Sequence, residues 1–359
     1  MYKFSEYVSP GHPDKVADYI SEYILDRYLE LDPNVRYAVE VMIKGFSVYV
    51  AGEVTSTVNL EKNMLQYVKE ALNEIGYTWE YAMRWGLDHV INSEGVTVYT
   101  NITTQSPEIG QGVTNNGWGD QGIFFGYADP DGDEFMMPKS HSLAKNLCFM
   151  LYNQAKDEGI GGIDIKTEII LNDFGYVEKI IAAVPCRNDD EYDLILKSIQ
   201  RWFDEVDPTY PLYPEIVLNG TGNYVMHGPG ADCGVTGRKL AVDFYGGEFQ
   251  VGGGSPWTKD GSKADLTLNL YARQLAIMFA KKHKTAVKVS LACCIGKSEI
   301  NYSVNTPCGD DIESGVLIIT PNDLKGKLGL DKPIFTSMCW FGLFGEYQQE
   351  HEWEKQLNS

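Results

Sequence analysis

The sequence is short of positive charge and of long apolar runs. It carries 30 lysines and arginines against 50 aspartates and glutamates, for a formal net charge of −20. Nucleic-acid-binding proteins normally present a basic face, so this balance argues against nucleic acid as a partner. No apolar run approaches the roughly 20 residues that a membrane helix requires, which argues against a membrane partner. The first residues lack the apolar core of a secretory signal, so we expect a cytoplasmic protein.

Cysteine is also scarce, and its spacing has no pattern. The seven cysteines are scattered along the chain and include no C-x-x-C pair. This spacing indicates neither a zinc site nor a framework of disulfides. We expect reduced thiols that are buried or half-buried.

Three stretches of the 359-residue chain share one order of predicted elements. In each, an apolar stripe of helical period precedes two alternating segments that predict a hairpin. The predicted helices begin at Pro13, Pro138 and Ala264, which indicates a repeat of about 125 residues. The pattern predicts an α+β fold of three structurally related domains, each a small, mainly antiparallel sheet with helices on one face. We place the domains at residues 1–104, 111–226 and 228–359.

The segment Gly11-His12-Pro13-Asp14-Lys15 is the first candidate for binding an anion. Pro13 opens a predicted helix, so His12 and Asp14 lie at its amino end, where N–H groups and the helix dipole favour negative charge. A histidine there can donate to phosphate, and a carboxylate can hold Mg²⁺ that in turn binds phosphate. The alternative is an ordinary helix cap with a surface histidine, and these five residues alone do not exclude it.

Two glycine-rich segments concentrate cations against the negative background: DCGVTGRK (232–239) and GGGSPWTKDGSKAD (252–265). Their candidate cations are Arg238, Lys239, Lys259 and Lys263. Arginine forks and lysine point charges are usual ligands of triphosphate, and glycine lets the backbone approach phosphate closely. Asp265 opens a predicted helix, where it would serve equally well as an N-cap. No GxxxxGK[ST] motif occurs, so the predicted site is not a P-loop.

Charged side chains on predicted strands are weaker candidates. Asp164 and Lys166 lie on one face of a strand predicted over 163–172, where they could contact a ribose hydroxyl and a phosphate. Glu40 and Glu53 lie on the two strands of the first predicted hairpin. A solvated sheet face is the commoner explanation for such charges.

Taken in order, these motifs resemble those of the methionine adenosyltransferase (S-adenosylmethionine synthetase) family along nearly the whole chain. The similar segments are GHPDK (11–15), AGEVTS (51–56), TTQSPEIGQGV (103–113), GWGDQG (117–122), DIKTE (164–168), DCGVTGRK and GGGSPWTKDGSK. The resemblance implies that the methionine sulfur attacks C5′ of ATP and expels triphosphate, which is then hydrolysed to pyrophosphate and phosphate. A thioether is already a good nucleophile, so the enzyme's work is alignment and stabilisation of the leaving triphosphate.

The resemblance also implies roles for individual residues. The implied catalytic residues are His12, Lys166, Arg238 and Lys259. The implied ATP-binding residues are His12, Asp120, Asp164, Lys166, Asn223, Tyr224, Asp232, Arg238, Lys239, Ser255 and Lys259. The implied methionine-binding residues are Glu53, Gln105, Asp232, Lys263 and Ile295. Asp14 and Asp265 would bind Mg²⁺, and Glu40 would bind K⁺.

Family members build paired active sites across a dimer interface, so the resemblance implies a homodimer or a dimer of dimers. Their three domains have pseudo-threefold symmetry, in agreement with the repeat. Pro10 stands where the family usually has Glu, Asn223 and Glu346 stand where it has Arg, and Trp118 replaces a small residue. The segment from Gln105 to Asp120, which includes the family's mobile lid, is shorter than usual. We interpret the chain as a divergent member.

Two other functions fit parts of the pattern. A non-catalytic homologue could keep the fold, but the presence of His12, Asp14 and Lys259 opposes it. A triphosphatase or phosphotransferase could use the same phosphate ligands, but the methionine-pocket candidates Glu53, Gln105 and Ile295 oppose it. We therefore predict synthesis of S-adenosylmethionine from ATP and L-methionine.

Overall fold

The computed structural model describes residues 2–104, 117–206 and 213–355. Its strands are β1 (Lys3–Val8), β2 (Arg36–Lys44), β3 (Ser47–Thr55), β4 (Thr97–Thr103), β5 (Gly122–Ala128), β6 (Lys166–Leu171), β7 (Val177–Ala183), β8 (Glu215–Leu218), β9 (Gly234–Val235), β10 (Val287–Cys293), β11 (Glu299–Asn305) and β12 (Asp311–Ile318). Its α-helices are α1 (Pro13–Leu29), α2 (Met64–Ile75), α3 (Trp79–Trp85), α5 (Lys139–Asp157), α6 (Asp189–Val206), α7 (Leu240–Asp243), α8 (Ala264–His283), α9 (Pro321–Leu328) and α10 (Phe335–Trp340).

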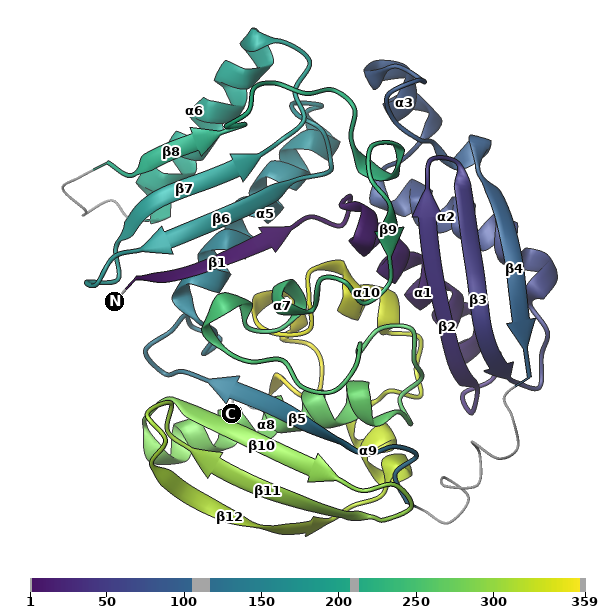
Figure 1. The fold of residues 1–359 in the computed structure, drawn as a ribbon, viewed down its shortest axis with the longest axis vertical. Coiled ribbons are helices and arrows are strands. Elements are labelled where there is room, and N and C mark those ends of the chain that lie inside the picture. Colours follow the sequence, from purple (N-terminus) through teal and green to yellow (C-terminus); the bar gives the residue numbers. More distant parts are fainter. Residues whose placement is uncertain (1, 105–116, 207–212, 356–359) are drawn as a thin grey trace.

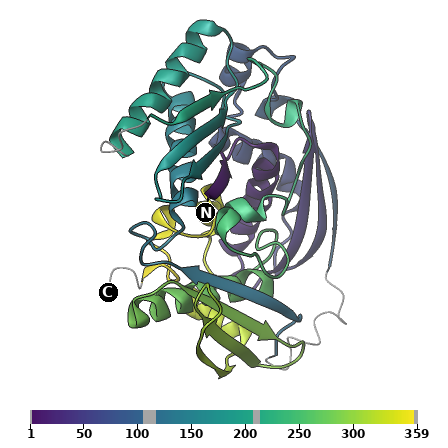
Figure 2. The same cartoon turned by 60° about the vertical axis from the view of Figure 1, so that its left-hand side comes forward.

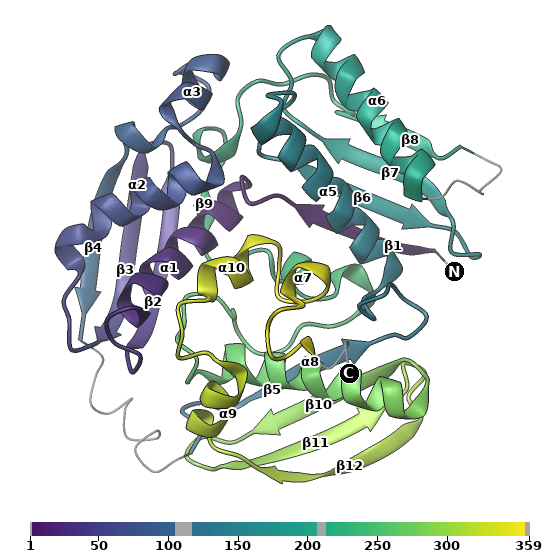
Figure 3. The same cartoon turned by 180° about the vertical axis from the view of Figure 1, so that it is seen from behind.

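The strands form three four-stranded sheets, in the orders β9-β2-β3-β4, β1-β6-β7-β8 and β5-β10-β11-β12 (Figure 1). The two middle strands of each sheet are an antiparallel hairpin. The outer strands β4 and β8 run parallel to their neighbours β3 and β7, whereas β12 runs antiparallel to its neighbour β11. The main helices of each sheet lie on one of its faces, as the views in Figures 2 and 3 show. The predicted α+β class, with three related sheets, is confirmed.

The three units exchange strands in a cycle. Strand β1 leads into α1 but pairs with β6 of the central hairpin. Strand β5 precedes α5 but pairs with β10, and β9 precedes α8 but pairs with β2. The exchange interlocks the units and joins segments across the predicted domain boundaries. The boundaries themselves stay a prediction.

Helix α1 begins where the sequence predicts. Pro13 occupies its first turn, and His12 is the N-cap residue, whose Nδ1 accepts the N–H of Asp14 at 3.1 Å. Every residue of α1 except Arg27 is buried, because α2, α10 and β9 pack around it as well as β2. Helix α1 is therefore buried on more sides than the predicted apolar stripe indicates. Gly76 ends α2 with a φ of 117°, in the region that glycine favours.

One local prediction is wrong, and one alternative reading of a carboxylate is excluded. The strand predicted from residue 163 begins at Lys166, so Asp164 lies ahead of the strand and not on its face. The N-cap residue of α8 is Lys263, so Asp265, in the first turn of that helix, is not a cap. Both corrections leave these acidic side chains at element ends, where a carboxylate is available to other groups.

Two expectations about chemistry can also be compared with the fold. All seven cysteines are free, as their spacing indicates, but Cys294 and Cys308 are exposed, so the expectation of burial is wrong for these two. None of the helices in the described part of the chain has the length and apolar character needed to cross a membrane.

Candidate active site

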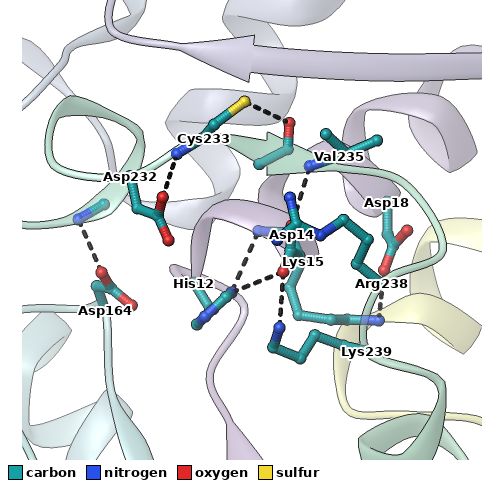
Figure 4. A network of polar contacts seen from close by, with 12 residues as sticks. His12, Asp14, Lys15, Asp18, Asp164, Asp232, Cys233, Val235, Arg238 and Lys239 are labelled. Carbon is teal, nitrogen blue, oxygen red and sulfur yellow. Dashed lines mark hydrogen bonds and ion pairs between the residues drawn. The ribbon is translucent and has the colours of Figure 1, made fainter.

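The amino end of α1 carries a charged cluster drawn from three segments of the chain (Figure 4). Its members, called the His12 cluster below, are His12, Asp14, Asp164, Lys166, Asp232, Arg238 and Lys239. Lys166 is the first residue of β6, Asp164 lies just ahead of that strand, and the loops flanking β9 supply the last three. Because β1 pairs with β6 and β9 pairs with β2, the strand exchange brings these segments together.

Asp14 is the centre of the ion pairs in the His12 cluster. Its Oδ2 lies 2.7 Å from Lys239 Nζ, and its Oδ1 lies 3.6 Å from Arg238 Nε. The N–H of Val235, on β9, donates to the same carboxylate at 3.0 Å. Burial by itself raises the pKa of Asp14, but the bonds from Lys239 and Val235 outweigh it and lower the pKa overall. Asp14 is therefore a carboxylate at neutral pH.

His12 is a neutral hydrogen-bond donor at neutral pH. Its Nδ1 accepts the N–H of Asp14, so the ring proton lies on Nε2. Burial, together with the charges of Lys239 and Lys166, lowers the pKa of His12 to about 3. The Nε2–H can therefore donate to an anion while the ring itself carries no charge.

Asp164 is prepared to accept a hydrogen bond from a ligand. The N–H of Gly228 donates to its Oδ2 at 2.8 Å, while its Oδ1 is buried and has no partner among the described residues. Burial raises the pKa of Asp164 to about 6, and the charge of Asp232 contributes to the rise. Burial, followed by the charge of the nearby Asp164, raises the pKa of the Tyr224 hydroxyl. Asp232 and Tyr224 therefore both lie within electrostatic range of Asp164.

A network of buried charged side chains, which the sequence did not predict, supports the His12 cluster. Lys15 Nζ lies 2.6 Å from Asp243 Oδ1 and 3.1 Å from Asp18 Oδ2, and all three side chains are buried. Trp257 Nε1 donates to Asp243 at 2.7 Å, and the Lys15 ammonium lies 4.5 Å from the centre of that indole ring. Asp18 also accepts the N–H of Gly237. No periodicity marks these residues, because α1 is buried on every side.

A second group of charges, called the Lys259 cluster below, consists of Asp120, Lys259, Lys263 and Asp265. Lys259 Nζ lies 2.5 Å from Asp265 Oδ2, whose Oδ1 accepts the N–H of Gly254 at 2.8 Å. Lys263 pairs with the buried Asp260 at 2.6 Å. Burial, followed by the charges of Asp120 and Asp265, raises the pKa of the Cys293 thiol, so each of these carboxylates lies within electrostatic range of Cys293.

The remaining predicted residues lie at separate positions. Glu40 accepts hydrogen bonds from the hydroxyls of Thr236 and, at 3.1 Å, Thr258. Glu53 is opposite Ala38 in the first hairpin, and Ala38 forms a backbone bridge with Lys259. This places Glu53 beside the Lys259 cluster.

Ile295 is 54% exposed and bridges to Trp118, a fully buried residue that departs from the family pattern. The Ser255 hydroxyl accepts the N–H of Trp257 at 3.2 Å. The Asn223 amide donates to Asp189 at 3.1 Å. Gln105 lies outside the described residues.

Glu40 bonds to both loops that carry the clusters, because it accepts hydrogen bonds from Thr236 and from Thr258, the neighbour of Lys259. In the ranges that the structure describes, no hydrogen bond or ion pair joins a member of the His12 cluster to a member of the Lys259 cluster. The same ranges contain no group of three or more acidic, histidine or cysteine side chains arranged to hold a metal. Each cluster has one carboxylate paired with a lysine, Asp14 with Lys239 and Asp265 with Lys259.

The chain matches two family models and several relatives. The model "S-adenosylmethionine synthetase, N-terminal domain" matches residues 1–107, and "S-adenosylmethionine synthetase, C-terminal domain" matches residues 226–355. S-adenosylmethionine synthase of Acholeplasma laidlawii is 35% identical over 98% of this chain and 96% of its own length. The enzyme of Sorangium cellulosum is 34% identical over 99% of this chain and 87% of its own.

A solved structure is similar over the whole molecule. The structure titled an unusual S-adenosylmethionine synthetase from Campylobacter jejuni has a TM-score of 0.85 and 31% sequence identity. The match covers 100% of this chain and 98% of that chain. The likeness therefore includes the fold that carries both charged clusters.

Proposed function

Since the chain belongs to the S-adenosylmethionine synthetase family, and makes S-adenosylmethionine from ATP and L-methionine, we propose that its two charged clusters are the halves of one active site. The observation that carries the proposal is the pairing in each cluster of a lysine with an aspartate: Lys239 with Asp14, and Lys259 with Asp265. Each half can bind a phosphate chain through its lysine and a cation through its aspartate.

The proposed chemistry needs charge stabilisation more than proton transfer. Methionine sulfur displaces the triphosphate from C5′ of ATP, and negative charge builds on the departing oxygen. The Nε2–H of His12 donates to that oxygen, and Lys166, Arg238 and Lys259 supply positive charge along the phosphates. Fixed donors and charges of this kind are worth about 10²- to 10³-fold in turnover each. The subsequent hydrolysis of triphosphate uses the same cations.

The residues fit the metals that the sequence implies. Mg²⁺ in proteins is usually bound by one or two carboxylates together with substrate phosphates, and each cluster offers one such carboxylate, Asp14 or Asp265. When bound, Mg²⁺ supplies positive charge to the phosphate oxygens. Glu40 with the hydroxyls of Thr236 and Thr258 offers the oxygen ligands that a hard cation such as K⁺ takes.

The nucleoside and methionine ends of the site follow from the remaining residues. The buried, unpaired Oδ1 of Asp164 suits a ribose hydroxyl, and Tyr224 can stack on adenine. The other proposed ATP contacts are Asp120, Asn223, Asp232 and Ser255. We assign methionine to Glu53, Gln105, Asp232, Lys263 and Ile295.

We propose that a second copy of the chain completes the site, as a homodimer or a dimer of dimers. The outer face of the first sheet supports this. Met42, Tyr49 and Tyr99 are exposed there, and the two tyrosine rings stack with centroids 4.9 Å apart. An exposed apolar face of this kind is typical of an interaction surface. The cytoplasmic location stays a prediction from the sequence.

Mixing two inactive variants tests the shared site. In a dimer of Asp14→Asn and Lys259→Ala chains, one site contains both changes and the other contains neither. Random pairing after co-expression makes half the dimers mixed, so about a quarter of the wild-type activity returns. Activity no higher than that of the separate variants would show that each site lies within a single chain.

A further inference from the structure

Two tyrosines at the start of α3 reach into the segments that carry the His12 cluster. Gly76 ends α2, and the Thr78 hydroxyl starts α3 by accepting the N–H of Tyr81 at 3.1 Å. Tyr77 and Tyr81 are buried, and their rings meet edge to face with centroids 5.9 Å apart. Neither residue is among those assigned to substrate or metal.

The Tyr81 hydroxyl is part of a hydrogen-bond chain whose direction is fixed at every step. A carbonyl can only accept, so His227 Nδ1 donates to the carbonyl of Val225 at 2.7 Å and Nε2 is left as an acceptor. The Tyr81 hydroxyl donates to Nε2 at 2.5 Å and accepts the N–H of Ile163 at 2.9 Å. Burial lowers the pKa of His227 to about 4, which keeps the ring in the neutral form that this chain requires.

Both ends of the chain of bonds lead directly to Asp164. Ile163 precedes Asp164 in sequence, and His227 precedes Gly228, whose N–H donates to Asp164 Oδ2 at 2.8 Å. The Tyr81 hydroxyl therefore ties together the two segments that fix this carboxylate. The Tyr77 hydroxyl makes a parallel contact, because it donates at 2.6 Å to the carbonyl of Gly11, next to His12.

We propose that Tyr81 is a positioning residue for ATP, acting through Ile163 and His227 to hold Asp164 at the distance and angle that a ribose hydroxyl requires. The inference rests on the proposed role of Asp164 in binding ATP. A ring without the hydroxyl keeps the packing but releases the two segments from each other.

Steady-state kinetics of Tyr81→Phe test the inference, with Tyr152→Phe as the matched control. Tyr152 is also buried, and its hydroxyl donates at 2.6 Å to the carbonyl of Ile75 and not to either segment that fixes Asp164. Tyr81→Phe loses two buried hydrogen bonds and Tyr152→Phe loses one, so we expect both melting temperatures to fall, and that of Tyr81→Phe to fall further. Only Tyr81→Phe should raise KM for ATP, by about tenfold, with KM for methionine changed much less.

Two further variants keep the outcome decisive. His227→Asn removes the other partner of the Tyr81–His227 hydrogen bond and should raise KM for ATP to a similar extent. This variant also tests the proposal if Tyr81→Phe does not fold. Asp164→Asn separates the two assumptions. If Asp164→Asn weakens ATP binding but Tyr81→Phe and His227→Asn do not, the positioning role is wrong and the proposed function stands. If Asp164→Asn leaves KM for ATP unchanged, Asp164 does not bind ATP and the inference fails with that assignment.

Discussion

Lys239 Nζ lies 2.7 Å from Asp14 Oδ2, so a side chain assigned to phosphate and one assigned to Mg²⁺ hold each other. Lys259 and Asp265 repeat the arrangement at 2.5 Å. Triphosphate with Mg²⁺ carries a partner for each member of such a pair. Binding can therefore open both ion pairs without leaving a charge unpaired. An unpaired charge would be costly for groups that are at least partly buried.

Neutralising Asp14 should stop catalysis without unfolding the protein. Asp14→Asn keeps the size of the side chain but loses the charge that holds Lys239 and would hold Mg²⁺. We expect turnover to fall by about 10²- to 10³-fold, and Lys259→Ala to have a similar effect. Initial rates at saturating substrates, with melting temperatures of the same samples, measure this.

The exposed pair of Lys69 and Glu94, whose charged atoms are 2.8 Å apart, provides the control. Glu94→Gln removes an ion pair of similar length that includes no member of either cluster, and it should leave turnover unchanged. Near-normal turnover of Asp14→Asn would show that Asp14 is not part of the active site.

Shortening Tyr224 should weaken ATP more than methionine. The half-buried ring is proposed to stack on adenine, and loss of one such stack costs about 1–3 kcal/mol. Tyr224→Ala should therefore weaken ATP binding by about tenfold or more, as calorimetric titration with each substrate would measure. Phe174→Ala, at an exposed ring on the central hairpin turn, is the control. Equal losses for ATP and methionine would exclude the stacking role.

Removing the charge of Asp164 should stabilise the fold while it weakens ATP binding. Burial raises the pKa of Asp164 to about 6, whereas an unfolded aspartate titrates near 3.9. Between these two pKa values the folded state keeps the proton on Asp164 that the unfolded state has lost. The stability that this protonated form contributes is therefore lost as pH rises through 6. Above that pH the charged form costs up to about 3 kcal/mol.

Melting temperatures of the wild type and of Asp164→Asn, measured over a range of pH, test the predicted direction of this pH dependence. Asp164→Asn does not titrate, so it should melt above wild type at pH 8, and the difference should shrink towards pH 4. A lower melting temperature than wild type at pH 8 would contradict the argument.

Glu40 should control the response to K⁺. Glu40→Gln removes the negative charge from the oxygen cluster that includes Thr236 and Thr258. Rates measured with and without K⁺ should then be equal in the variant, while K⁺ raises the rate of wild type and of the exposed control Glu61→Gln. An unchanged K⁺ response in Glu40→Gln would place the ion elsewhere.

The repeated helices and hairpins could be predicted because their patterns are local. Helical and alternating periods mark α1, α5 and α8 and the hairpins that follow them. The strand exchange could not be predicted, since β9 has only two residues, Gly234 and Val235, and no alternation to detect. Its pairing depends on β2, far away in sequence.

The site was predicted from motifs, and its contacts were not. The resemblance named Asp14 and Lys239, but nothing in the sequence pairs residues 225 positions apart. The support from Lys15 and Asp243 was missed because buried charges carry no periodic signal. The role of Tyr81 depends on the partner of its hydroxyl, which only the folded chain defines.

The most direct test of the account is mass spectrometry of the purified protein incubated with ATP, L-methionine, Mg²⁺ and K⁺, beside the same mixture without methionine. The account predicts a methionine-dependent sulfonium product together with pyrophosphate and phosphate. Phosphate released equally without methionine, and no sulfonium product, would contradict it and indicate a triphosphatase that uses the same cations.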